Sequence, residues 1–263
     1  MIKSNLLLRL LSAAILIPVV LGAVFYGNPY YNILIALMGA CMGWEWETMV
    51  RGKFSPLGMI IGTAAVIVSF TTAEMPEVSL LVILAAAAIV YFKSEKNVLL
   101  TFGTFYVGLP VASMIYIYYI KDATSVDIVL WLLFVIWATD TGGYIVGKTV
   151  GGPKLLPKIS PKKTWAGLIG AMIFAGGVSY GFALLREVEG FSPMLLAGIG
   201  AVMAVISQAG DFFESWIKRR LNLKDSSQLI PGHGGIFDRV DGLLFTAPVV
   251  AAILIFINLG ILP

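Results

Sequence analysis

The chain alternates between long apolar segments and short polar ones. Nine apolar segments of helical length occur, at about 10–26, 30–44, 57–72, 78–92, 98–120, 128–146, 165–185, 193–208 and 243–262. A helix needs about 20 apolar residues to cross a bilayer, so most of these segments are long enough to span one. The third and fourth are short, which predicts tilted helices or helices completed by flanking residues. The pattern predicts an all-α, polytopic membrane bundle of about nine transmembrane helices.

Composition supports a membrane protein and excludes an ordinary soluble domain. The 263 residues are 59% hydrophobic and 13% charged, and the mean hydropathy is +0.91; these values lie outside the range of soluble domains. The first apolar segment follows Lys3 and Arg9, as in a secretory signal, but it lacks a small-x-small cleavage site and more spans follow it. We therefore expect an uncleaved first helix. The single cysteine, Cys41, is expected to be a small core residue.

The distribution of basic residues predicts the orientation. Cytoplasmic loops carry the excess of Lys and Arg. With a cytoplasmic N-terminus, nine helices place only Lys121 and Arg186 of the 18 basic residues outside, and they place the C-terminus outside. The inside set is then Lys3, Arg9, Arg51, Lys53, Lys93, Lys96, Lys148, Lys154, Lys158, Lys162, Lys163, Lys218, Arg219, Arg220, Lys224 and Arg239.

The polar loop 93–97 suggests a division into two parts. The N-terminal transmembrane part covers residues 1–97, and the C-terminal transmembrane part covers residues 98–263. The second part contains the two basic loops, 147–164 and 211–242, which the orientation places in the cytoplasm.

The stretch 211–242 concentrates charge, glycine and the only histidine of the chain. Its first part, read as a helix, places four polar residues on one face by their spacing of three, four and seven: Asp211, Glu214, Ser215 and Lys218. A glycine-rich turn at 231–235 follows, whose backbone N–H groups could cradle an anion. Asp238 and Asp241 come next, three residues apart and therefore on the same side of a helical turn.

These residue types fit a site for magnesium and a polyphosphate. Magnesium prefers oxygen ligands and is usually held by one or two carboxylates together with substrate phosphates. Lysine and arginine neutralise the remaining phosphate charge.

The same stretch resembles the C-terminal signature of the phosphatidate cytidylyltransferases, also called CDP-diacylglycerol synthases. The matching positions cover about an eighth of the chain and show no departure from the signature; they are Ser215, Lys218-Arg219, Lys224-Asp225, Pro231, His233-Gly234-Gly235, Asp238-Arg239 and Asp241. The resemblance implies a nucleotidyltransferase of phospholipid biosynthesis that converts CTP and phosphatidate to CDP-diacylglycerol and pyrophosphate. It also implies an enzyme of the cytoplasmic (inner) membrane with its site facing the cytoplasm.

Under this hypothesis each polar residue receives a role. One Mg²⁺ ion, or two, would be held by Asp211, Asp238 and Asp241. The catalytic set is Asp211, Ser215, Lys218, Asp238, Arg239 and Asp241. The substrate-binding set is Lys162, Lys163, Arg219, Lys224, His233, Gly234, Gly235 and Asp140. The expected partners are CTP, phosphatidate within the bilayer and membrane lipids, without nucleic acid; a homodimer is compatible with so compact a membrane enzyme.

Asp140 and the basic segment after it form a second polar cluster. A carboxylate near the end of an apolar segment indicates a functional site, although a helix-end acid that caps the helix or pairs with a lysine is the alternative. The segment 148–164 resembles the second recurring stretch of the same family, so we expect both loops to form one site. A basic cytoplasmic loop by itself determines topology or contacts anionic headgroups.

Three other features receive conservative interpretations. Residues 142–149 satisfy the Walker A pattern, but they end an apolar segment and precede Gly-Gly-Pro, so we reject a P-loop. His233 is expected to contact phosphate or support its loop rather than act in acid–base catalysis, and no second His or Cys completes a zinc site. Glu45 and Glu47 are expected to be interface residues beside their tryptophan neighbours.

Two rival functions remain open at this stage. The first is another lipid-phosphate enzyme, such as a CTP-dependent polyprenol kinase. The second is a secondary transporter with intramembrane carboxylates and glycine-broken helices, which should show inverted hydropathy repeats and work without nucleotide.

Overall fold

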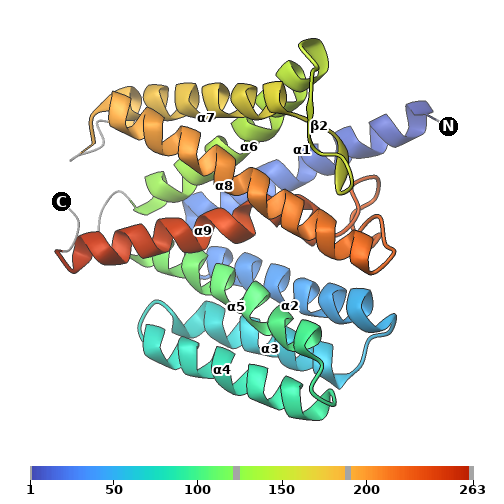
Figure 1. Cartoon of the computed structure of the whole chain (residues 1–263). Coiled ribbons are helices and arrows are strands. Elements are labelled where there is room, and N and C mark those ends of the chain that lie inside the picture. The colour runs from blue at the N-terminus through green and yellow to red at the C-terminus, as the bar shows by residue number, and fades with distance from the viewer. Residues whose placement is uncertain (1, 121–124, 187–190, 261–263) are drawn as a thin grey trace.

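The computed structural model describes residues 2–120, 125–186 and 191–260, without the side chains of residues 2–7, 9 and 10. The described residues form a bundle of nine helices and one short hairpin (Figure 1). The elements are α1 (Ile2–Tyr26), α2 (Tyr30–Arg51), α3 (Pro56–Thr71), α4 (Pro76–Lys93), α5 (Val98–Tyr119), α6 (Ser125–Thr149), β1 (Lys154–Leu156), β2 (Ser160–Thr164), α7 (Trp165–Arg186), α8 (Pro193–Arg220) and α9 (Phe237–Asn258).

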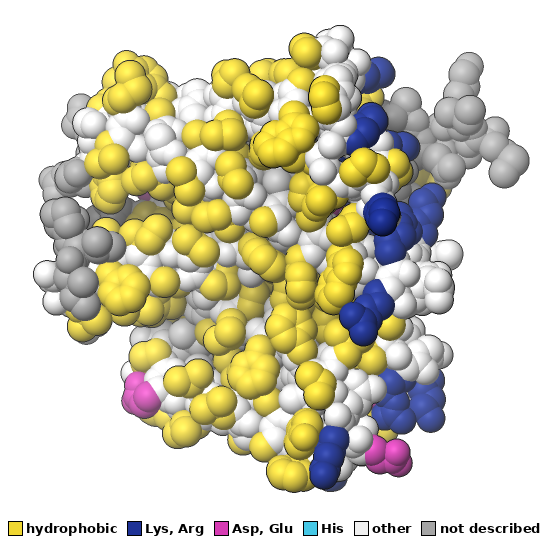
Figure 2. All heavy atoms as spheres, viewed as in Figure 1, with side chains coloured by type: hydrophobic (Ala, Val, Ile, Leu, Met, Phe, Trp, Pro, Cys, Tyr) yellow, Lys and Arg dark blue, Asp and Glu magenta, His cyan; other side chains and the backbone are white. Residues whose placement is uncertain are grey.

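The all-α prediction is confirmed, and seven of the helices formed by described residues are long and apolar enough to cross a membrane: α2, α4, α5, α6, α7, α8 and α9. Helix α3, with 16 residues, and the apolar part of α1 are shorter. This is the architecture of a multi-pass membrane protein, whose hydrophobic side chains cover most of the visible face (Figure 2).

Helix ends follow local signals in the sequence. Ser55 and Asn97 accept hydrogen bonds from backbone N–H groups in the first turns of α3 and α5, as capping side chains do. Proline begins α3, α4 and α8, where its missing N–H costs nothing. Gly52 ends α2 in the left-handed conformation, with φ of 69°. The polar segments between the apolar runs therefore became helix boundaries.

The helices form two groups that meet at α9. Helices α6, α7 and α8 pack together on one side, and α2 to α5 pack together on the other. Helix α9 contacts both α8 and α5, and α1 contacts α2 and α6. Small residues allow the close approaches: a Cβ at Gly170 would lie 2.4 Å from Val146 Cβ, and one at Gly43 would lie 2.4 Å from the Gly62 nitrogen. This placement puts α9, which carries Asp238 and Asp241, in the interior.

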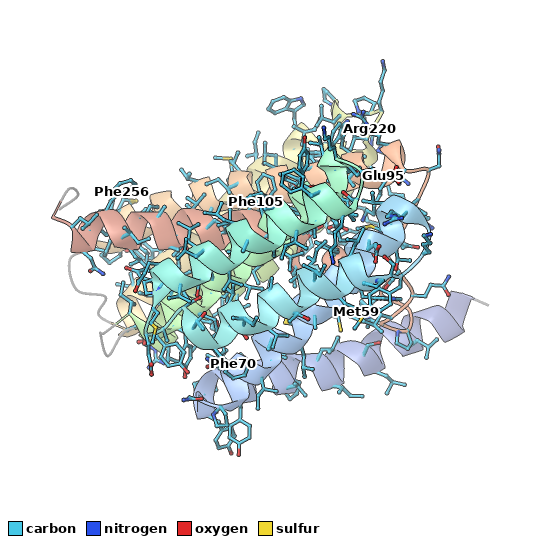
Figure 3. All side chains as sticks on the ribbon, turned by 90° about the horizontal axis from the view of Figure 1, so that it is seen from below. Met59, Phe70, Glu95, Phe105, Arg220 and Phe256 are labelled. Carbon is cyan, nitrogen blue, oxygen red and sulfur yellow. The ribbon has the colours of Figure 1, made fainter. Side chains whose placement is uncertain are left out.

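The polar chemistry gathers at one end of the bundle. Figure 2 shows the visible Lys and Arg side chains along a single edge, the end where the hairpin and the loop after α8 lie (Figure 1). In the view of Figure 3, Arg220 and Glu95 lie at this end and Phe256 lies at the opposite end. At that opposite end Arg186 forms an ion pair with Asp127 at 2.9 Å; Lys121 lies outside the described residues. Helix α1 begins at the basic end, and α9 runs away from it.

Two details differ from the sequence-based expectations, and a third agrees with them. The segment after α6 contains an antiparallel hairpin, β1–β2, with Lys154 opposite Thr164, which the apolar pattern could not indicate. Helices α2 and α8 extend well beyond their apolar segments, to Arg51 and Arg220, and α8 thereby includes the first polar residues of the signature. Gly142 to Thr149 are helical, as the rejection of a P-loop requires.

Candidate active site

Helices α8 and α9 cross closely, and this crossing positions the two central carboxylates. A Cβ at Gly210 would lie 2.4 Å from the Asp241 carbonyl oxygen, and a Cβ at Gly242 would lie 2.2 Å from Ser207 Oγ. Only glycine permits such an approach of two backbones. Asp211 therefore lies beside Asp241, near enough for the two negative charges to act on each other.

One face of α8 carries the predicted row of polar residues. Ser215 Oγ donates a hydrogen bond to Asp211 Oδ1 at 3.2 Å, one turn away. The Lys218 ammonium lies 2.9 Å from Glu214 Oε1, again at a spacing of four residues. Glu214 and Lys218 are both buried. The prediction of a single polar helix face is confirmed.

Asp238 is held in a closed network at the start of α9. Its Oδ1 accepts a hydrogen bond from Lys218, and its Oδ2 accepts from the Ser226 backbone and hydroxyl and from Gly235 N, at 2.8 to 2.9 Å. The Asp238 carboxylate thus joins α8, the loop and α9. Asp241, one turn later, interacts electrostatically with the carboxylates of Asp211, Glu214 and Asp140.

The glycine turn folds around Asp238 as well. Gly234 has φ of +86°, a conformation that favours glycine, and a Cβ there would lie 2.6 Å from Asp238 Oδ2. His233 contributes its carbonyl oxygen, which accepts a hydrogen bond from Arg239 Nε at 3.0 Å. The turn therefore supports the loop, and whether its N–H groups bind an anion stays a prediction.

The hairpin brings the second basic segment to the same place. Lys163, on β2, forms an ion pair with Asp211, which joins the two loops that the sequence predicted to share one site. A cavity of about 440 Å³ opens between the hairpin, α6 and α7. Its polar lining is basic, apart from one acid; the charged residues are Asp140, Lys148, Lys154, Lys162 and Lys163.

A second cavity, of about 420 Å³, lies on the other side of Asp140 and is mostly apolar. Aliphatic and aromatic side chains of α1, α2, α6 and α9 line it, while Asp140, His233 and Arg239 supply its charged or ionisable groups. Asp140 lines both cavities. Asp140 also lies inside α6, more than two turns before its end, so it does not cap this helix.

Four predicted substrate-binding residues line neither cavity: Gly234 and Gly235 of the glycine turn, and Arg219 and Lys224. Arg219 is exposed and donates to the Leu223 carbonyl oxygen at 2.9 Å, an interaction within the loop after α8. Lys224 is exposed in the same loop. The roles of all four in substrate binding therefore stay predictions.

The donor set fits a magnesium ion only in part. Among the described residues, no three His, Cys, Asp or Glu side chains are arranged to hold a metal by themselves. Magnesium needs only one or two carboxylates when substrate phosphates and water complete its shell. The Asp211 and Asp241 carboxylates interact electrostatically with each other, and Asp140 interacts with both. Asp238 is still a predicted ligand, but its oxygens already accept hydrogen bonds, so a metal there would displace donors.

Sequence reasoning missed the most heavily hydrogen-bonded carboxylate outside the signature. Glu45 of α2 is fully buried and contacts the signature loop rather than lying at an interface with its tryptophan neighbours. Glu47, equally buried, accepts hydrogen bonds from Ser55 N and Gly58 N at the start of α3. Two glutamates directly after the apolar segment 30–44 were the available signal, since a charge that becomes buried requires partners.

Comparison with known proteins agrees with this arrangement. The model of the cytidylyltransferase family matches residues 7–257. A phosphatidate cytidylyltransferase of Brucella suis is 33% identical over 93% of this chain and 91% of its own length. The corresponding enzyme of Rickettsia bellii is 32% identical over 97% of this chain and 92% of its own length. The chain belongs to the cytidylyltransferase family, and the resemblance first seen in 211–242 extends over nearly its whole length.

Proposed function

We propose that the chain is a magnesium-dependent phosphatidate cytidylyltransferase of phospholipid biosynthesis, placed in the cytoplasmic membrane with its site toward the cytoplasm. The observation that carries this proposal is the pair of cavities that share Asp140: one is basic and the other is apolar. CTP is a soluble polyanion, whereas phosphatidate has one anionic group on two hydrocarbon tails. The relatives named phosphatidate cytidylyltransferase support this choice of substrates.

The basic cavity suits the triphosphate of CTP. Four lysines line it, and one of them, Lys163, also contacts Asp211, one of the two central carboxylates. Lysine ammonium groups bind phosphate oxygens by charge-assisted hydrogen bonds. The triphosphate would therefore extend from the hairpin toward Asp211.

The apolar cavity suits the lipid. Its walls accommodate acyl chains, while Arg239 supplies a guanidinium that matches phosphate oxygens. The lipid phosphate would then lie near the first turn of α9. The two substrates would approach Asp140 from different sides, one from water and the other from the bilayer.

The reaction needs positioning and charge neutralisation more than a strong base. A phosphatidate oxygen attacks the α-phosphorus of CTP, the new P–O bond forms, and the bond to the β-phosphate oxygen breaks to release pyrophosphate. Lys163, Lys218 and Arg239 would neutralise charge around the reacting phosphates. Bound Mg²⁺ would stabilise the negative charge that develops on the transferring group, with Asp211 and Asp241 as the residues that hold it.

Pyrophosphate release by the purified protein in detergent tests the proposal. We expect release with phosphatidate, magnesium and CTP together, and none when the lipid or metal is omitted or ATP replaces CTP. Asp211→Asn should abolish it, whereas Glu95→Gln, which removes an exposed carboxylate outside the signature in the loop after α4, should not. Folded protein without CTP-dependent release would contradict the proposal, and transport without nucleotide would favour the rival.

A further inference from the structure

Glu45 is a fully buried carboxylate that accepts hydrogen bonds from residues far away in the sequence. Its Oε1 accepts from Ser227 Oγ at 2.6 Å and from Ile236 N at 2.8 Å. Its Oε2 accepts from Phe237 N at 3.0 Å and lies 3.3 Å from Ser226 Oγ. The described Lys, Arg and His side chains form no ion pair with it. Hydrogen-bond donors of one loop therefore balance its charge.

Glu45 supplies the cap that α9 lacks. Ile236, at the N-cap position of α9, offers no capping side chain. The first N–H groups of a helix have no partner inside it, and the partial positive charge at that end favours an anion. The carboxylate of α2, about 190 positions earlier, takes this role at the Ile236 and Phe237 N–H groups.

The same carboxylate is linked to the signature acid of α9. The Ser226 hydroxyl lies 2.9 Å from Asp238 Oδ2 and 3.3 Å from Glu45 Oε2, so its one proton can be donated to either. Gly235 lies between these groups, because a Cβ there would come within 2.0 Å of Ser226 Oγ and 2.3 Å of Glu45 Oε1. The packing around Glu45 thus explains why this position of the glycine turn has no side chain.

We propose that Glu45 is a positioning residue for the nucleotidyl transfer. It fixes the first turn of α9, and with it Asp238, Arg239 and Asp241, against the N-terminal helices. The inference rests on the proposed function for its kinetic consequence, but the hydrogen-bond role stands on the geometry alone. Glu45 itself lines neither cavity, so it acts through the residues it holds.

Glu47→Gln is the matched control for Glu45→Gln. Both residues are buried glutamates of α2 that accept hydrogen bonds from a helix start, but Glu47 serves α3. In Glu45→Gln an NH₂ group replaces one accepting oxygen, and NH₂ cannot accept from a backbone N–H. We expect kcat to fall about tenfold, with smaller changes in KM, and backbone hydrogen exchange to rise in 226–238. Glu47→Gln should raise exchange near 55–58 and leave kcat unchanged.

Ser227→Ala gives a milder second variant, which removes one donor to Glu45 and should lower kcat less than Glu45→Gln. Unchanged kcat and unchanged exchange in both Glu45→Gln and Ser227→Ala would overturn the inference, as would an equal loss of kcat in Glu47→Gln. If the wild-type protein lacks CTP-dependent turnover, the proposed function fails, and the exchange comparison alone then decides the role of Glu45. Melting temperature in detergent shows that each variant is folded.

Discussion

The two cavities have nearly equal volumes, about 440 and 420 Å³, yet opposite linings. One is formed by the hairpin and the ends of α6 and α7 and carries four lysines; the other lies among α1, α2, α6 and α9 and is mostly hydrocarbon. Asp140 lines both. Charged phosphates and apolar acyl chains need different surroundings. A single pocket for both would leave either a charge without water or partners, or an apolar surface in water. The difference suggests that the bundle keeps the two substrates apart until their phosphates meet.

Asp241→Asn should have the largest effect on the reaction, because Asp241 is, with Asp211, one of the two residues proposed to hold the magnesium ion. We expect kcat/KM to fall by about a hundredfold or more for both substrates, measured by pyrophosphate release over a range of magnesium concentrations.

Asp238→Asn, one turn earlier on α9, provides the contrast. It breaks the buried pair with Lys218, and loss of one partner of a buried pair costs about 3 kcal/mol of stability. Its melting temperature should therefore fall more than that of Asp241→Asn. A stable Asp238→Asn protein with altered magnesium dependence would instead establish Asp238 as a metal ligand.

Lys162→Gln should affect one cavity alone. Lys162 is exposed and lines the basic cavity, so losing its charge should raise the KM for CTP by up to about tenfold and leave that for phosphatidate unchanged. Lys158→Gln, in the same hairpin but outside the cavity lining, is the control. Equal effects of both substitutions would show that general surface charge, rather than the cavity, attracts the nucleotide.

Ala13→Phe should affect the other cavity by a smaller amount. Ala13 lines the apolar cavity from α1, and a larger side chain would compete with acyl chains, at a cost of about 1 kcal/mol or about fivefold in the KM for phosphatidate. Ala14→Phe places the same ring on the exposed side of the helix. A matching rise in the KM for CTP would contradict the separation of the two cavities.

Asp127→Asn should have the smallest effect. Its ion pair with Arg186 lies at the end of the bundle opposite the basic cavity, neither residue lines either cavity, and the Arg186 side chain is 47% exposed. Exposed pairs contribute less than about 1 kcal/mol. Neither KM should change, and the melting temperature measured in detergent should fall only slightly. A loss of turnover would mean that the far end is coupled to the site.

Local patterns in the sequence were sufficient for most of the fold and for the family. Hydrophobic runs predicted the helices because each helix forms its backbone hydrogen bonds within one segment. The spacing of Asp211, Ser215 and Lys218 predicted one face of α8 for the same reason, and the signature in 211–242 indicated the family. The predicted pairing of the two basic loops appears in the contact between Lys163 and Asp211.

Only the tertiary structure decided which distant groups meet. The hydrogen bonds from Ile236 and Phe237 to Glu45, the saturation of Asp238 by its donors and the place of Asp140 between two cavities depend on how α2, α6, α8 and α9 pack. Gly177 shows the same limit: glycines in membrane helices often mark close packing, yet a Cβ there would meet no atom within 4 Å. Hydrophobic periodicity predicts the secondary structure of one segment and which of its faces is apolar. Contacts between residues about 190 positions apart form only when the helices pack together. They cannot be predicted from any one segment.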